Sequence, residues 1–195
     1  FVAEMPASVD ITAAYSGDTN TYPEPPKGIR IKRLTHSSSD EGIVRGSYSG
    51  KQIAYLSKDK KGILQVFVIP SDGSDKANDP KKRPKQVTNY TVDASNVRWH
   101  PFDQWLFSVS DGKVYASYIG SSEGFGKSIL LTPDVLNREA LVVSPDGKRL
   151  AYNVDLPSAT ESHIIDGEQN NVYKQIFVLE LHDALMRTTH QDNLK

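Results

Sequence analysis

The stretch that decides the fold is Leu-Val-Val-Ser-Pro-Asp-Gly-Lys-Arg-Leu-Ala-Tyr, at residues 141–152. Two short apolar runs flank its Ser-Pro-Asp-Gly tetrapeptide. Proline presets the backbone at the second position of a four-residue turn, and glycine suits the last position. The stretch therefore predicts a β-hairpin, made of a short strand, a tight turn and a second strand.

The hairpin pattern recurs along the chain, at residues 44–55, 97–108 and 141–152. Each hairpin is followed by a stretch rich in β-branched and aromatic residues, which favour strands, at 64–69, 113–119 and 175–181. A fourth, short strand is expected to end in a Leu-Thr or Val-Thr pair: Leu34-Thr35, Val87-Thr88 and Leu131-Thr132. The spacing from Thr88 to Thr132 matches one propeller blade of four strands, and the longer spacing before it contains a lysine-rich insertion.

This repeat predicts an all-β fold, a β-propeller fragment of about three and a half four-stranded blades. We expect the last two strands of a blade at 1–35, blades at 36–88 and 89–132, a blade lacking its outer strand at 133–181, and a tail at 182–195. Such a set cannot close a ring, so the missing blades are expected in upstream sequence of the same protein, whose far N-terminus would supply the absent outer strand. The alternative is that two such chains assemble one ring.

Three motifs resemble the TolB-like propeller repeat: Arg33-Leu34-Thr35-His36, the turn and its second strand at 144–152, and Gln175-Ile176-Phe177-Val178. The order of features along the chain is similar to the C-terminal half of the YidR-like bacterial propellers, a family of unknown function. The resemblance covers residues 29–181 and implies the propeller fold. It also implies a periplasmic or secreted protein, since TolB-like propellers are often periplasmic, with a cytoplasmic location as the alternative.

The composition is that of an ordinary globular protein, with 37% hydrophobic residues, 24% charged residues and a net charge of −1. Neither nucleic-acid binding nor attraction to an anionic membrane is expected from this balance. No apolar run approaches the ~18 residues of a membrane-spanning helix. Cysteine is absent, which excludes disulfides, thiolate metal sites and cysteine nucleophiles.

Arg45 and Arg98 occupy equivalent positions in the innermost strands of successive blades, two residues before the turn begins. The guanidinium fork suits carboxylates, so two arginines from adjacent blades can bind an anionic ligand together. The alternative is a structural ion pair between each arginine and an Asp or Glu of a neighbouring blade. The following blade has Val142 at this position, which weakens the idea of a complete arginine ring.

His36 and His163 are the histidines best placed to reach a face of the propeller. His36 follows the Leu34-Thr35 pair, where the chain crosses to the next blade, and His163 lies in a long excursion at 157–173. Both are candidate ligand-binding residues. A metal site needs three or four convergent ligands, so we expect neither a metal nor another cofactor. His100 occupies a turn position, where a structural hydrogen bond is expected instead.

The sequence contains no nucleophile elbow, zinc-protease motif, P-loop or dinucleotide-binding glycine pattern, so no catalytic residue is assigned. Two functional classes remain. The first is a binding module that recognises a polymer, peptide or protein partner. The second rests on a more distant resemblance to the oligogalacturonate lyase propellers, and fold analogy alone supports it. It implies a lyase on uronate oligosaccharides from pectin, with a divalent metal and an arginine that neutralises the substrate carboxylate.

Overall fold

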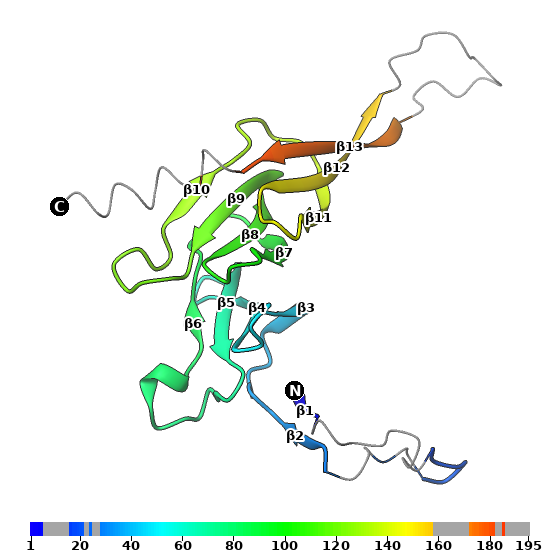
Figure 1. Ribbon diagram of the computed structural model, residues 1–195, viewed down its shortest axis with the longest axis vertical. Helices are drawn as coiled ribbons and strands as arrows, with labels where there is room; N and C mark the ends of the chain where they lie inside the picture. The colour runs from blue at the N-terminus through cyan, green and yellow to red at the C-terminus, as the bar shows by residue number, and fades with distance from the viewer. Residues whose placement is uncertain (6–15, 22–23, 25–27, 158–171, 182–184, 186–195) are drawn as a thin grey trace.

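The computed structural model describes residues 1–5, 16–21, 24, 28–157, 172–181 and 185. These residues form the antiparallel sheets labelled in Figure 1. The first sheet pairs β1 (Val2–Glu4) with β2 (Arg30–Lys32). The second contains β3 (Asp40–Gly46), β4 (Gln52–Lys58), β5 (Leu64–Pro70) and β6 (Lys85–Gln86). The third contains β7 (Ala94–Trp99), β8 (Trp105–Ser110), β9 (Lys113–Tyr118) and β10 (Ser128–Leu130). The fourth contains β11 (Arg138–Val143), β12 (Arg149–Pro157) and β13 (Val172–Glu180).

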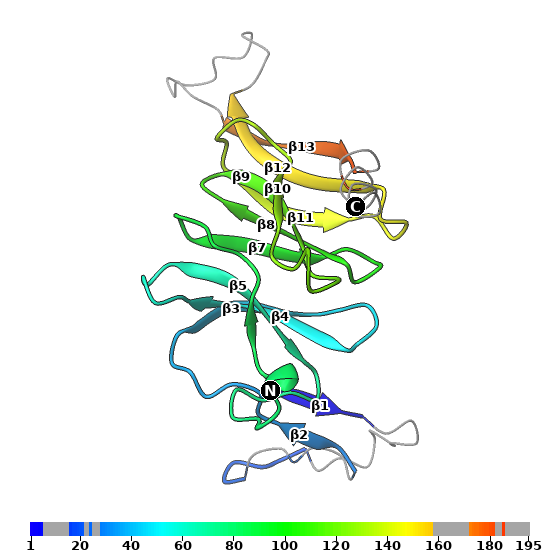
Figure 2. The ribbon, with the colours of Figure 1, turned by 90° about the vertical axis from the view of Figure 1, so that its left-hand side faces the viewer.

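The sheets stack on one another in chain order, as Figure 2 shows, from β1 and β2 at the bottom to β13 at the top. Within the second, third and fourth sheets the strands also follow chain order, so the first strand lies at one edge. These first strands touch across the stack, because β7 contacts β3 and β11 contacts β7. Antiparallel sheets stacked with their first strands on a common side are the blades of a propeller. The predicted fold class, a β-propeller fragment, is confirmed.

The hydrophobic core lies between successive sheets. One cluster joins the second and third sheets and includes Val66, Trp99 and Leu106. Another joins the third and fourth sheets and includes Phe107 and Leu141, which are both 0% exposed. Each blade therefore completes its core by packing against its neighbours.

The three predicted hairpins are present, and each turn ends in a residue with a left-handed backbone: Gly50, Asp103 or Gly147, with φ of 71°, 55° and 70°. In all three turns the N–H of this residue donates to the carbonyl of the first turn residue at 2.9 Å. Asp103 occupies a position with a left-handed backbone, which glycine adopts at a lower energetic cost than aspartate. Its carboxylate compensates by accepting the N–H groups of Tyr48 and Ser49, both at 2.9 Å, from the turn of the preceding blade.

The fourth strand ends earlier than the sequence predicts, because β6 and β10 stop immediately before the Val87-Thr88 and Leu131-Thr132 pairs. The Val87 N–H still donates to the Val66 carbonyl at 2.8 Å, but the Val66 N–H donates to the Thr88 hydroxyl oxygen at 2.9 Å. The second pair makes the same two bonds to β9, at 2.8 and 2.9 Å. The threonine side chain thus replaces the main-chain acceptor at the point where the strand leaves the sheet.

Removing the Thr88 hydroxyl should destabilise the protein. Thr88 is 2% exposed and also donates to Gln65 Oε1 at 2.8 Å. Thr88→Val keeps the side-chain shape but leaves the Val66 N–H buried without an acceptor, so we expect the free energy of unfolding to fall by about 2 kcal/mol. Urea unfolding followed by tryptophan fluorescence measures it. Thr35→Val is the matched control, since no hydrogen bond of the Thr35 hydroxyl is found among the described residues. Equal losses in the two variants would contradict the role of the hydroxyl.

Candidate functional site

The innermost strands β3, β7 and β11 each contain a β-bulge. Their register with the second strand shifts between Glu41 and Arg45, between Ser95 and Arg98, and between Glu139 and Val142. The residue that enters each bulge has a left-handed backbone: Gly42, Asn96 or Ala140, with φ of 73°, 54° and 54°. The Ala140 N–H donates to Asn96 Oδ1 at 3.1 Å, which joins two of the bulges. Bulges re-aim the residues that follow them, here Arg45, Arg98 and Val142.

A cavity of about 280 Å³ lies at these three strands, and we call it the arginine cavity. It is lined by Arg45, Gly46, Tyr48, Arg98, Trp99, Val142 and Val143. The structure therefore places Arg45 and Arg98 side by side at one cavity, together with Val142 at the equivalent position of the next blade. The lining combines two cationic groups with apolar and aromatic surface, which is the composition of many ligand sites.

The two guanidinium groups of Arg45 and Arg98 share this cavity. Among the described residues neither side chain pairs with a carboxylate, so the ion pair kept as an alternative is not found there. Arg98 Nη1 donates to the neighbouring Val97 carbonyl at 2.8 Å. Burial lowers the pKa of Arg98, and the positive charge of Arg45 lowers it further. Both effects disfavour the charged guanidinium, so an anion bound between the arginines would relieve an existing repulsion.

Neighbouring blades hold the cavity wall in place. The Trp99 indole N–H donates to the Arg45 carbonyl at 2.8 Å, which fixes the strand that carries Arg45. Tyr48 is anchored through its N–H by the Asp103 carboxylate at 2.9 Å. Burial raises the pKa of Asp103, but hydrogen bonds from Ser49 and Tyr48 outweigh it and leave this pKa below its ordinary value. In the sequence, the one sign of this contact is an aspartate, Asp103, at a turn position that is glycine in the next blade. The sequence gives no sign that Tyr48 lines the cavity.

His36 does not line the arginine cavity. Its Nδ1 is 2.8 Å from Asp75 Oδ1, and its N–H donates to the same carboxylate at 2.6 Å. Asp75 belongs to the insertion between β5 and β6, so His36 fastens that insertion to the loop after β2. His163, the other histidine predicted from the sequence, lies outside the described residues.

His100 makes the structural hydrogen bonds expected of it. Its Nδ1 accepts the Phe102 N–H at 3.2 Å, and its Nε2 is 3.1 Å from the Gly147 carbonyl of the next blade. Burial lowers the pKa of His100, which favours the neutral ring. In the part of the chain that the structure describes, no three His, Cys, Asp or Glu side chains gather in a group that could hold a metal ion.

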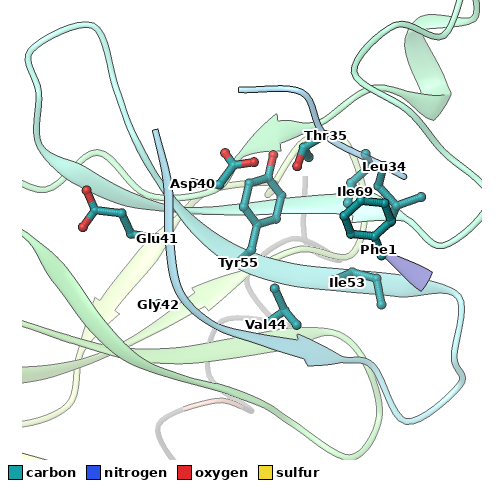
Figure 3. Close-up of a pocket in the computed structure, with 10 residues that line it drawn as sticks. All are labelled: Phe1, Leu34, Thr35, Asp40, Glu41, Gly42, Val44, Ile53, Tyr55 and Ile69. Atoms are coloured by element: carbon teal, nitrogen blue, oxygen red, sulfur yellow. The ribbon is translucent and has the colours of Figure 1, made fainter. Parts of the chain in front are cut away.

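A second cavity, of about 240 Å³, lies between the first sheet and the second. Figure 3 shows the Tyr55 hydroxyl, the Asp40 carboxylate and the Thr35 hydroxyl near one another, with Phe1 and Ile53 toward the other end. Burial is the main cause that raises the pKa of Tyr55, and the negative charges of Asp40 and Asp75 raise it further. The lining is thus mainly apolar, with a small polar group at one side.

The chain is similar in sequence to one curated protein and in structure to several solved ones. The chain is 33% identical to the uncharacterized protein YidR of Escherichia coli K12 over 153 aligned residues, which cover 72% of this chain and 34% of YidR. No protein-family model matches the chain. TolB of Acinetobacter baumannii superposes with a TM-score of 0.47 at 18% identity, over 73% of this chain and 33% of TolB. An acylaminoacyl peptidase of Pyrococcus horikoshii superposes with the same TM-score, 0.47, at 9% identity, over 74% of this chain and 23% of the peptidase.

The chain spans about a third of the length of the curated relative that it matches, 34%. The described residues include no helix long and apolar enough to cross a membrane.

Proposed function

From the premise that this chain is a TolB-like β-propeller protein of the YidR-like group, we propose that it is a recognition module that binds a carboxylate-bearing ligand in the arginine cavity. The observation that carries the proposal is the pair of guanidinium groups of Arg45 and Arg98, which face one cavity without a carboxylate partner among the described residues. A binding partner with a carboxylate supplies the missing charge and accepts hydrogen bonds from both forks.

The ligand is a polymer, a peptide or an acidic segment of a protein partner. Trp99, Tyr48 and Val142 line the cavity beside the arginines, so the ligand also presents apolar surface next to its carboxylate. The cavity is formed by three blades at once, and a ligand seated there contacts β3, β7 and β11 together. We propose no catalytic step, because fold analogy alone supports the lyase alternative. The exported location stays a prediction.

The proposal is tested with hexaglutamate as an anionic probe and hexaglutamine as its neutral counterpart, using titration calorimetry at low salt. We expect hexaglutamate to bind and hexaglutamine to bind at least about tenfold more weakly, since hydrogen bonds to charged groups contribute about 1.5–3 kcal/mol each. The double variant Arg45→Gln/Arg98→Gln should weaken hexaglutamate binding by about 10- to 100-fold.

The control for this experiment is Lys51→Gln/Lys148→Gln, which removes the same net charge from two exposed residues at the turns of the second and fourth sheets. Neither lysine lines the arginine cavity. If the control loses as much affinity as the arginine variant, the binding is general charge attraction and the proposed site is wrong. Failure of hexaglutamate to bind the parent protein would contradict the proposal as well.

A further inference from the structure

One buried histidine joins the turn before β8 to the turn before β12. His100 is 7% exposed, and the ring centroids of Phe102 and Phe107 lie 5.2 and 6.2 Å from its own. On the side of the fourth sheet the ring meets Gly147, where a methyl group would stand 2.5 Å from His100 Nε2. Only glycine lets the backbone of the fourth-sheet turn approach the ring this closely.

The two hydrogen bonds of this ring require its neutral form. The Gly147 carbonyl can only accept, so Nε2 carries the proton, whereas Nδ1 accepts the Phe102 N–H and is unprotonated. Protonation would place a second N–H on the ring, directed at the N–H of Phe102, and this hydrogen bond would be lost. It would also bury a charge. Acid therefore acts directly on the contact between the two turns.

The charged groups near His100 are engaged elsewhere. The ionisable residues on the elements that contact it are Arg98, Asp103, Asp146 and Lys148, and β8 contains none. Each of the two aspartates already accepts main-chain N–H groups of a hairpin turn. Arg98 lines the arginine cavity. Burial lowers the pKa of His100, and the hydrogen bond to the fourth-sheet turn opposes this effect only in part.

The turn that contains His100 also supports the wall of the arginine cavity. Trp99 comes directly before His100 and lines the cavity. Asp103 ends the turn and anchors Tyr48, which lines the cavity as well. On the other side of the contact, Val143 of the lining comes directly before the fourth-sheet turn. A shift of the His100 turn would therefore move lining residues of more than one blade.

We infer that His100 is a positioning residue for the arginine cavity and a pH-sensitive contact between the third and fourth blades: its neutral ring holds the two turns together, and its protonation releases them and weakens binding of the anionic ligand. The effect on the ligand rests on the proposed function, whereas the contact between the blades does not. The other two hairpins have serine at this turn position, Ser47 and Ser144, whose hydroxyl groups accept main-chain N–H groups at 3.2 and 3.0 Å. Serine thus fits the position without titrating near neutral pH.

The pH dependence of unfolding tests the contact between the blades. Stability is full above pH ~6.5 and falls below it, because the unfolded chain takes up a proton on His100 before the folded protein does. In urea unfolding followed by tryptophan fluorescence, we expect the unfolding constant of the parent protein to rise by up to about tenfold more per pH unit than that of His100→Ser. The control Phe102→Ala disturbs the same turn but keeps the imidazole, so it should keep the pH dependence.

Binding of hexaglutamate tests the link between His100 and the cavity. We expect titration calorimetry at pH ~7.5 and ~5 to show that the parent protein loses at least about fivefold more affinity on acidification than His100→Ser. The two proteins meet the same peptide, so partial protonation of its carboxylates cancels in the comparison.

Each other result counts against a stated part of the inference. Parallel pH dependence of unfolding in the parent protein and His100→Ser would overturn the contact. If unfolding differs but affinity falls equally in both proteins, the link to the cavity is wrong. If the parent protein fails to bind hexaglutamate at the higher pH, the proposed function is contradicted, and unfolding alone then decides on His100. If His100→Ser does not fold, His100→Asn, whose side-chain oxygen can accept the Phe102 N–H, gives the answer under the same criteria.

Discussion

Phe107→Ala is expected to lower the free energy of unfolding by about 3–5 kcal/mol, the range for deleting a large buried aromatic side chain. Phe107 is 0% exposed and belongs to the cluster that joins the third and fourth sheets. Its neighbours come from two blades, including Leu141 of β11, so they cannot collapse into the space without separating the sheets. The lost contacts and the remaining cavity therefore add together.

Phe102→Ala provides the matched control, because Phe102 is 67% exposed and lies in the turn just before β8. Its removal should change the free energy of unfolding by no more than about 0.5 kcal/mol. Urea unfolding reports both variants through Trp99 and Trp105, which are each 3% exposed and lie in different interblade clusters. Similar losses in the two variants would show that the sheets do not depend on packing between blades.

The fold was predictable from the sequence because its signals are local and repeated. The Ser-Pro-Asp-Gly turn at 144–147 specifies a hairpin by its own chemistry, and the same pattern recurs in the blades before it. The strand ends were less predictable. The Val87-Thr88 pair was expected to end the fourth strand, but β6 stops just before it, and only the structure shows that the Thr88 hydroxyl, not a backbone carbonyl, accepts the Val66 N–H.

The sequence predicted where the two arginines of the candidate site lie, but it did not predict which groups surround them. Equivalent spacing before the turn identifies Arg45 and Arg98 as neighbours. Whether a carboxylate lies opposite them depends on contacts between distant segments, which spacing does not reveal. The same holds for His36, whose partner Asp75 lies in an insertion peculiar to one blade. The bulges were also invisible, because Gly42, Asn96 and Ala140 share a left-handed backbone but no residue type.

Gly112→Ala is expected to destabilise the protein by about 3 kcal/mol, from left-handed strain of about 1–2 kcal/mol and a steric clash of similar size. Asp111 and Gly112 form the two-residue turn between β8 and β9, with φ of 50° and 67°. A methyl group at Gly112 would stand 2.6 Å from the Leu136 carbonyl oxygen, which is backbone and cannot rotate away. The turn cannot retreat freely either, since the buried Arg138 donates to the Gly112 carbonyl at 2.7 Å.

Gly62→Ala separates the two causes. Gly62 has φ of 81°, and a methyl group there would meet nothing within 4 Å. Its substitution carries the left-handed strain and the altered entropy of the unfolded chain without a clash, so we expect a loss of about 1 kcal/mol. The difference between the two variants in urea unfolding then measures how firmly the Asp111–Gly112 turn is held against Leu136. If both variants lose the same free energy of unfolding, the turn moves and relieves the clash. The contact of this turn with Leu136 is then not rigid.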